Sequence, residues 1–421
     1  MVLLFQIIAV CTNIFIFFLA IHKLKHKLTI TYIILLIFQA VFVLPIIFEW
    51  LFGVQDYSYK SPGFDKALND STTNIYYSFF VIIVSLGLFV SGKKTKGLVM
   101  QDIKDSLANL TIKREFYILI AMLMFLPVVV ALLAPSPDKY ILEYAYFQKY
   151  SDIVTETEIW YHQNVLRIAG IISLLSIVIT KLFSKNTFFN NFLIYSAAII
   201  TGVLNGKRTL FAFIILGILV VDILKSPKGK FPLKKIIASA LFIVLIFIIY
   251  AFAIDKHTLN VTTLDNIRLY FFRDVDVKFA IYALLNPVQY KVLEFWGQSY
   301  LYNALFYIPR TWWIDKPYPY DIYVTSAALN LPPETVLSWS FQTSIFGEAL
   351  SNLGLLGIVF SLLILYKFIQ VSERSGNPVI ILLCIFIIVR SFMNHFGSFS
   401  LFVIIWFLLI IYNKFKNKIR N

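Results

Sequence analysis

The side chains best suited to chemistry gather in residues 307–357. This stretch begins Y-I-P-R-T-W-W-I-D-K-P, with Arg310 beside Trp312 and Trp313, and continues to F-G-E-A-L-S-N-L-G-L-L-G, where Glu348 opens an apolar run. A guanidinium binds phosphate oxygens through two parallel hydrogen bonds, and a carboxylate can take a proton from a hydroxyl. The tryptophans have two readings, as rings that stack on sugars or as anchors at a membrane interface.

Arginine and lysine are distributed differently along the chain. Of the 28 lysines, 19 lie in a few short basic loops, whereas six of the nine arginines lie elsewhere. Phosphate recognition favours arginine, because its guanidinium is planar and always charged. The six arginines are therefore candidates for binding an anionic substrate: Arg167, Arg208, Arg268, Arg273, Arg310 and Arg390.

Lys207 and Arg208 stand in a tight turn between two apolar runs. Two readings remain open for this pair. The side chains either extend to the membrane interface or face an anion in a cavity.

Two residues could act as a general base. His395 lies in the hairpin N-H-F-G between the last two apolar runs, about one turn after Arg390, and Glu348 is the other candidate. Each also has a structural reading, as a hairpin histidine or as a carboxylate that a helix N-terminus stabilises. No adjacent acidic pair and no cysteine cluster is present, so we expect neither a metal nor another cofactor.

The elements that position these residues are membrane helices. Hydrophobic residues make up 59% of the chain and charged residues 14%, with a mean hydropathy of +0.78. A spanning helix needs about 20 mostly apolar residues. The sequence therefore predicts an all-α polytopic membrane protein with about eleven spans (10–12), near residues 2–21, 29–52, 74–91, 115–134, 165–183, 188–204, 209–224, 234–253, 346–366, 379–394 and 397–413.

The net charge of +14 reflects topology rather than nucleic-acid binding. When the loops are assigned alternately to the two sides, the basic loops all fall on one side, which marks that side as cytoplasmic. The sequence thus predicts an outer N-terminus and a cytoplasmic C-terminus.

A long polar segment interrupts the apolar runs and predicts three regions. These are an N-terminal bundle of about eight helices (1–253), a large extracytoplasmic loop (254–345) and C-terminal helices (346–421). Apolar residues at helical spacing in 264–285 predict an amphipathic helix along the membrane surface. Asp315 and Lys316 are expected to pair with each other or with water.

These features together resemble one family, the oligosaccharide repeat-unit polymerases, also called O-antigen or capsule polymerases (Wzy). The resemblance covers the whole chain in layout and rests on short motifs: P-R-T-W-W-I-D-K-P at 309–317, F-G-E-A-L-S-N-L-G-L-L-G at 346–357 and G-K-R at 206–208. One departure is that an R-x10-G spacing found in some members is absent, since positions 219 and 321 are Leu and Asp.

The resemblance implies a metal-independent glycosyltransferase of lipopolysaccharide or capsule biosynthesis in the bacterial inner membrane. Such an enzyme transfers a growing glycan from undecaprenyl pyrophosphate to the next lipid-linked repeat unit. Its partners would be the undecaprenyl-pyrophosphate-linked oligosaccharide, the lipid bilayer and a chain-length regulator. Arg208 and Arg310 would hold the pyrophosphate, with His395 and Glu348 as catalytic candidates. The candidates for substrate binding are Lys207, Arg268, Arg273, Arg390, Trp312 and Trp313.

Three further functions remain open at this point. An O-antigen ligase would share the layout and the arginines but pass finished polymer to another acceptor. A flippase or transporter for the same lipid-linked sugar would place charges inside several helices and carry an internal repeat, and no such repeat is evident. A receptor would need a binding loop without arginines clustered at membrane depth.

Overall fold

The structure is a computed structural model, and the residues that it describes form helices and no strands. It describes the chain outside residues 27, 55, 58–60, 96–112, 135–136, 138–160, 162–164, 186, 206–207, 226–272, 333–334, 336–339 and 421, and without the side chains of 208, 209, 212, 224 and 416–420.

Six helices in the described part are long and apolar enough to cross a membrane, or up to seven if one bent pair is a single span. The six are α1 (Val2–His26), the continuous run of α2 (Ile30–Phe38), η1 (Gln39–Val43) and α3 (Leu44–Phe52), α5 (Ser71–Lys94), α12 (Leu166–Phe183), α13 (Phe188–Asn205) and α21 (Leu356–Ser375). The bent pair is α7 (Arg114–Leu123) and α8 (Leu126–Leu132), which meet at 51°. Shorter apolar helices lie in α14 (Arg208–Leu224), α22 (Pro378–Met393) and α23 (Ser400–Arg420).

The described part of the chain is thus all-helical, and its apolar helices indicate a multi-pass membrane protein, as the composition predicts. The count of eleven spans and the sidedness of the termini stay predictions. The run at 234–253 lies outside the described residues.

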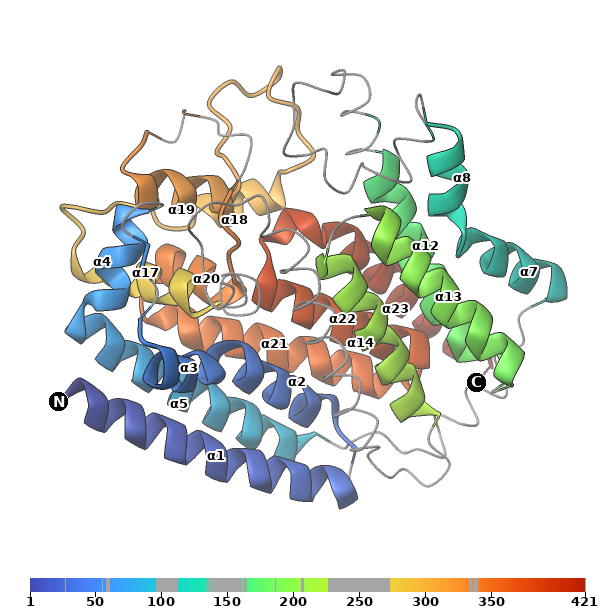
Figure 1. Ribbon diagram of the computed structural model, residues 1–421, viewed down its shortest axis with the longest axis horizontal. Helices are drawn as coiled ribbons and strands as arrows, with labels where there is room; N and C mark the ends of the chain where they lie inside the picture. Colours follow the sequence, from blue (N-terminus) through green and yellow to red (C-terminus); the bar gives the residue numbers. More distant parts are fainter. Residues whose placement is uncertain are drawn as a thin grey trace. The chain divides into compact units, whose positions relative to one another are not determined.

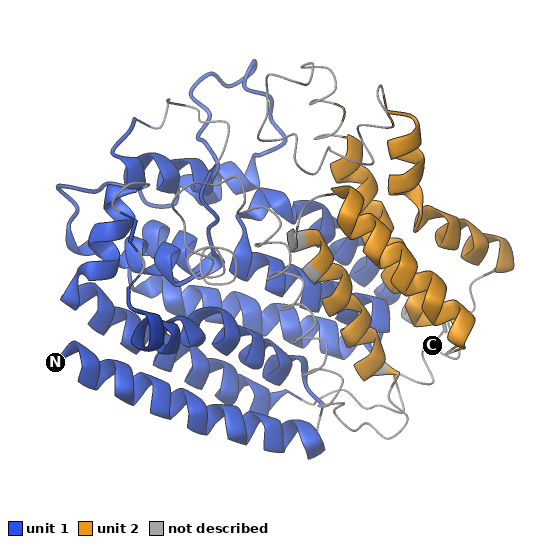
Figure 2. Ribbon diagram, in the orientation of Figure 1, with its two compact units in different colours: residues 1–98, 255–421 blue, residues 99–254 orange. Residues whose placement is uncertain are grey.

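Two compact units make up the chain (Figure 2). Unit 1 contains residues 1–98 and 255–421, and unit 2 contains residues 99–254. The first helices thus pack with the last third of the chain, although long stretches of sequence separate them. The three regions predicted from the sequence (1–253, 254–345 and 346–421) are consecutive in the chain, unlike these two units, and they stay a prediction.

A cluster of phenylalanine rings forms a core of unit 1. The Phe346 ring lies 5.2 Å from Phe80, 5.5 Å from Phe392 and 5.6 Å from both Phe38 and Phe42, measured between centroids. Edge-to-face and offset contacts at these separations stabilise aromatic pairs beyond their area burial. The cluster fixes α20 (Ile345–Leu353) against α2, η1, α5 and α22.

The polar segment after residue 272 is built of short helices packed on the spans. Figure 1 shows α17 (Asp274–Leu285), α18 (Gln298–Ala304), α19 (Tyr320–Leu329) and α20 on the same side of unit 1 as α4 (Pro62–Asn69). This arrangement brings five short helices together at one end of the spans.

The structure corrects the prediction of a surface helix within 264–285. Residues 264–272 are outside the described part, and α17 is buried along nearly its whole length, from Asp274 to Ala283. Lys278 and Asp276 find partners on other elements, so the helix is covered by protein on its polar face as well as on its apolar face.

The span predicted at 346–366 is also corrected. The helix is interrupted at Gly354, whose φ of +59° is a left-handed conformation that favours glycine. The long apolar helix is α21, from Leu356 to Ser375, and Glu348 lies in the short α20 that precedes it.

Candidate functional site

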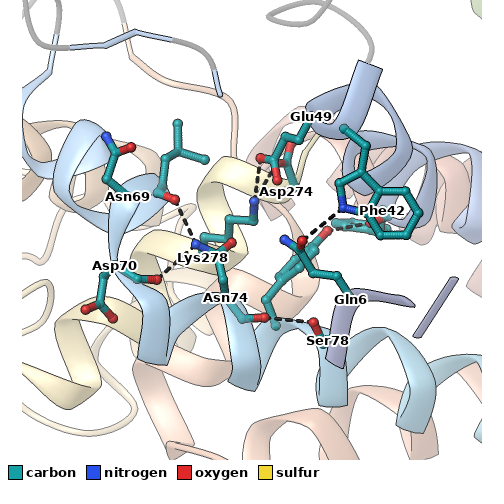
Figure 3. Close-up of polar contacts among 12 residues, drawn as sticks. Gln6, Phe42, Glu49, Asn69, Asp70, Asn74, Ser78, Asp274 and Lys278 are labelled. Atoms are coloured by element: carbon teal, nitrogen blue, oxygen red, sulfur yellow. Dashed lines mark hydrogen bonds and ion pairs between the residues drawn. The ribbon is translucent and has the colours of Figure 1, made fainter. Parts of the chain in front are cut away.

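A buried lysine joins α17 to the first spans. Lys278 is 1% exposed, and its Nζ lies 2.6 Å from Glu49 Oε1 and 3.4 Å from Asp274 Oδ2. The same amine lies 5.1 Å from the centroid of the Tyr77 ring. Figure 3 shows Lys278 between Glu49 and Asp274. A buried ammonium needs such partners, because the loss of its hydration costs several kcal/mol, as it does for any ion that is buried in a protein.

Two residues before Lys278, Asp276 joins α17 to the start of α20. Its Oδ2 accepts hydrogen bonds from the backbone N–H of Ser344 at 2.7 Å and from Ser344 Oγ at 2.6 Å. Ser344 Oγ also accepts from Gly347 N at 3.1 Å, as an N-cap does. A Cβ added to Gly347 would lie 2.2 Å from Asp276 Oδ2, so the carboxylate needs a glycine at this position.

Burial raises the pKa of Asp276 from 3.8 to about 7, and the charge of Glu348 adds to this shift. The two hydrogen bonds from Ser344 and the charge of Arg273 oppose it. Asp276 is therefore a buried carboxyl group whose pKa lies near neutral pH. Groups that transfer protons often have such a pKa.

Glu348 lies one turn further along α20 and is held by α18. Its Oε1 accepts hydrogen bonds from Ser299 Oγ and from Asn303 Nδ2, both at 2.7 Å. Asn352 Nδ2 donates to Ser299 Oγ at 2.7 Å and so fixes that hydroxyl. Burial raises the pKa of Glu348 from 4.5 to about 7, these hydrogen bonds lower it, and Asp321 raises it further.

His395 and Asp321 form an oriented pair. His395 Nδ1 lies 3.3 Å from Asp321 Oδ2, which also accepts a hydrogen bond from Ser340 Oγ at 2.6 Å. The carboxylate is 7% exposed and the imidazole 30% exposed, so the ring can reach solvent while its partner is buried. A carboxylate that fixes one ring nitrogen leaves the other nitrogen oriented for proton transfer.

Two tyrosines lie near these carboxyl groups. Tyr320 shares a hydrogen bond with Ser351 Oγ at 2.8 Å. Burial raises its pKa well above 10, and the charges of Asp276 and Glu348 raise it further. Burial and Glu348 also raise the pKa of Tyr300. Both hydroxyls therefore stay protonated and able to donate at neutral pH.

Three of the predicted arginines lie in the described part of unit 1. Arg310 is exposed and donates to the carbonyls of Lys316 and Pro317, at 2.7 and 2.9 Å. Arg273 is buried and donates to Gln342 Oε1, and burial lowers its pKa to about 10, so it stays charged at neutral pH. Arg390 is half-buried in the last turn of α22.

The other predicted site residues fall into two groups. Trp312 is 83% exposed and Trp313 is half-buried, both in the turn that carries Arg310. Lys207 and Arg268 lie outside the described residues, as does the side chain of Arg208, whose backbone begins α14 in unit 2.

The expectation that Lys316 pairs with Asp315 or with water is wrong. Lys316 is 7% exposed, and its Nζ donates to the carbonyls of Phe306 and Ile308 at 2.8 and 2.7 Å. Buried carbonyl oxygens need donors, and the lysine supplies them for this turn.

No protein-family model, curated protein or solved structure matches the chain. Within the described ranges, no three His, Cys, Asp or Glu side chains lie together as metal ligands would.

The structure thus brings together three of the predicted residues, His395, Glu348 and Arg273, with two that the sequence analysis missed. The missed residues are Asp276 and Asp321. Asp276 lies in the D-V-D-V motif of the segment read as a surface helix, and Asp321 follows Y-P-Y and lies in the first turn of α19. A carboxylate in the first turn of a helix commonly stabilises that helix end. The sequence alone therefore could not tell a functional role of Asp276 or Asp321 from this structural one.

Proposed function

We propose that the chain polymerises lipid-linked oligosaccharide repeat units, transferring the glycan from undecaprenyl pyrophosphate to the next lipid-linked unit at the outer face of the membrane. The observation that carries this proposal is the His395–Asp321 pair, 3.3 Å apart and partly open to solvent. An acceptor hydroxyl is a weak nucleophile at neutral pH, and a positioned base lowers its barrier.

In the proposed reaction, His395 takes the proton of the acceptor hydroxyl while the acceptor oxygen attacks the anomeric carbon of the donor. The bond from that carbon to the pyrophosphate oxygen breaks, and undecaprenyl pyrophosphate leaves with both bonding electrons. Asp321 stabilises the imidazolium that forms. Attack opposite the leaving group inverts the anomeric centre, so a retained configuration in the polymer would argue against a direct displacement.

Charge develops on the pyrophosphate as the bond breaks, and fixed cations stabilise it. Arg310 uses two of its N–H groups on backbone carbonyls and is exposed, so its remaining donors can face a phosphate. Arg390 precedes His395 in the same hairpin. Arg208 and Lys207 stay candidates from the sequence for binding an anion.

Glu348 is the second candidate base. Its carboxyl group titrates near neutral pH, but it is 6% exposed and both described hydrogen bonds to Oε1 come from the protein. His395 is the more accessible of the two. We therefore assign the proton transfer to His395 and assign Glu348 to the positioning of α18 against α20.

The test uses the purified full chain, lipid-linked repeat units and a gel that resolves products by length. We expect a ladder of products whose formation slows by about 100-fold or more in His395→Gln, the scale of a lost general base. Asp321→Asn should slow the ladder in the same direction, and His22→Gln, an exposed histidine of α1, should not change it.

A ladder that forms at full rate in His395→Gln and is lost in Glu348→Gln would move the base to Glu348. Transfer to a lipid A core acceptor, with no ladder on lipid-linked units, would identify a ligase instead.

A further inference from the structure

Residues 295–314, which we call the aromatic segment, turn apolar side chains outward. The segment contains eight aromatic residues and a single charged one, Arg310. Its large exposed side chains are Phe295 (48%), Trp296 (74%), Leu301 (38%), Phe306 (36%), Tyr307 (68%), Trp312 (83%) and Ile314 (84%). A contiguous apolar surface of this kind marks contact with another molecule or with a membrane.

Several backbone N–H groups of the aromatic segment donate to carbonyls within the segment, through successive turns. The N–H of Leu301 donates to Gly297 O at 2.9 Å, and turn bonds of 3.1 to 3.2 Å follow along the chain. These later bonds are Leu305 N to Leu301 O, Ile308 N to Leu305 O, Trp312 N to Pro309 O and Trp313 N to Arg310 O. A loop in water can leave such groups to the solvent, whereas backbone that faces acyl chains has no water to pair with.

Two cations complete this internal pairing. Lys316 donates to the carbonyls of Phe306 and Ile308, and Arg310 donates to those of Lys316 and Pro317. The Arg310 guanidinium also lies 3.9 Å from the centroid of the Tyr318 ring. Four carbonyl oxygens thus receive charged donors from within the turn, while the apolar side chains face outward.

The exposed surface of the aromatic segment continues that of a membrane helix. The Tyr300 ring lies 5.8 Å from the ring of Phe360, which places α18 beside the first turns of α21. The N-cap and first turns of α21 expose Leu355 (57%), Leu356 (73%), Val359 (53%), Phe360 (40%), Leu363 (55%) and Ile364 (42%). The apolar face of a candidate span therefore meets the aromatic segment at this ring contact.

We propose that the aromatic segment lies in one leaflet of the bilayer, at the boundary between headgroups and acyl chains beside the N-terminal end of α21. Trp and Tyr side chains favour this depth because their rings are apolar and their N–H or O–H groups are polar. The proposal concerns the lipid surface and does not depend on the reaction that the protein catalyses. Since α18 supplies Ser299 and Asn303 to Glu348, the contact also sets the depth of that carboxylate relative to the headgroups.

The experiment measures tryptophan fluorescence of the full chain in lipid nanodiscs. Two sets of nanodiscs carry lipids brominated near the headgroup end or near the tail end of the acyl chains, and iodide serves as the quencher from water. Trp312→Phe and Trp296→Phe assign the emission of each ring by difference. Trp406→Phe is the matched control, since Trp406 is 9% exposed and donates to Ser372 Oγ at 2.9 Å.

We expect the shallow bromine to quench the emission assigned to Trp312 at least about twice as strongly as the deep bromine, with little quenching by iodide. Trp296 should behave in the same way. Removal of Trp406 should leave the shallow-quenched component in place. Unchanged elution from size exclusion confirms that each variant is folded.

Two results would overturn the proposal. Quenching of the assigned emission by iodide alone would place the rings in water, as a surface for soluble sugars would require. Protection from both iodide and bromine would place them under protein, such as a second copy of the chain.

Discussion

Removal of the Lys278 amine tests whether buried charges hold α17 in place. Lys278→Met keeps the length of the side chain but leaves Glu49 and Asp274 facing each other without a cation. At an effective dielectric constant of about 20, contacts at these distances are worth roughly 6 and 5 kcal/mol of gross attraction. Desolvation of the ions offsets part of this, so we expect a loss of about 3–5 kcal/mol in the free energy of unfolding.

The measurement is reversible unfolding of the purified protein in mixed micelles with increasing SDS, followed by far-UV circular dichroism. Lys94→Met is the matched control, because Lys94 is an exposed lysine at the end of α5 and should change stability by less than about 0.5 kcal/mol. A neutral triple variant, Lys278→Met with Glu49→Gln and Asp274→Asn, should recover most of the loss, because no uncompensated charge remains.

A loss of less than about 1 kcal/mol for Lys278→Met would refute the reasoning, since a buried pair broken on one side costs several times that. A triple variant no more stable than the single variant would show that the packing of the lysine stem, and not its charge, holds the helix.

Three further predictions concern the same end of unit 1. Burial raises the pKa of Glu348 from 4.5 to about 7, so between these values the folded chain holds a proton that the unfolded chain releases. The free energy of unfolding therefore falls as pH rises through this window. Glu348→Gln should flatten this dependence on pH, which unfolding curves taken below, within and above the window would measure. An unchanged dependence would contradict the raised pKa of Glu348. Gly347→Ala places a Cβ 2.2 Å from Asp276 Oδ2 and should lower the unfolding temperature, whereas an unchanged temperature would show that the carboxylate moves freely. Lys316→Met leaves two carbonyls unpaired and should speed tryptic cleavage after Arg310, and unchanged cleavage would mean that the lysine does not brace the turn.

The sequence alone determined the helical, membrane-spanning character of the chain. Runs of apolar residues are a local signal, because each spanning helix satisfies its own backbone hydrogen bonds and needs only enough apolar side chains to face lipid. Glycine and proline positions carried local information too, and the break at Gly354 has a clear physical cause once its positive φ is known. The sequence also singled out His395 and Glu348 by residue type.

Only the tertiary structure decided which polar side chains meet. Lys278 and Glu49 are 229 positions apart in the chain, and no local pattern in 264–285 distinguishes a helix that lies on a membrane from one that is buried by distant partners. His395 lies 3.3 Å from Asp321, and Asp276 reaches Ser344 across 68 positions. A carboxylate has the same local signature whether it caps a helix or orients a histidine, because its role depends on which groups the packing of distant helices brings within hydrogen-bond distance.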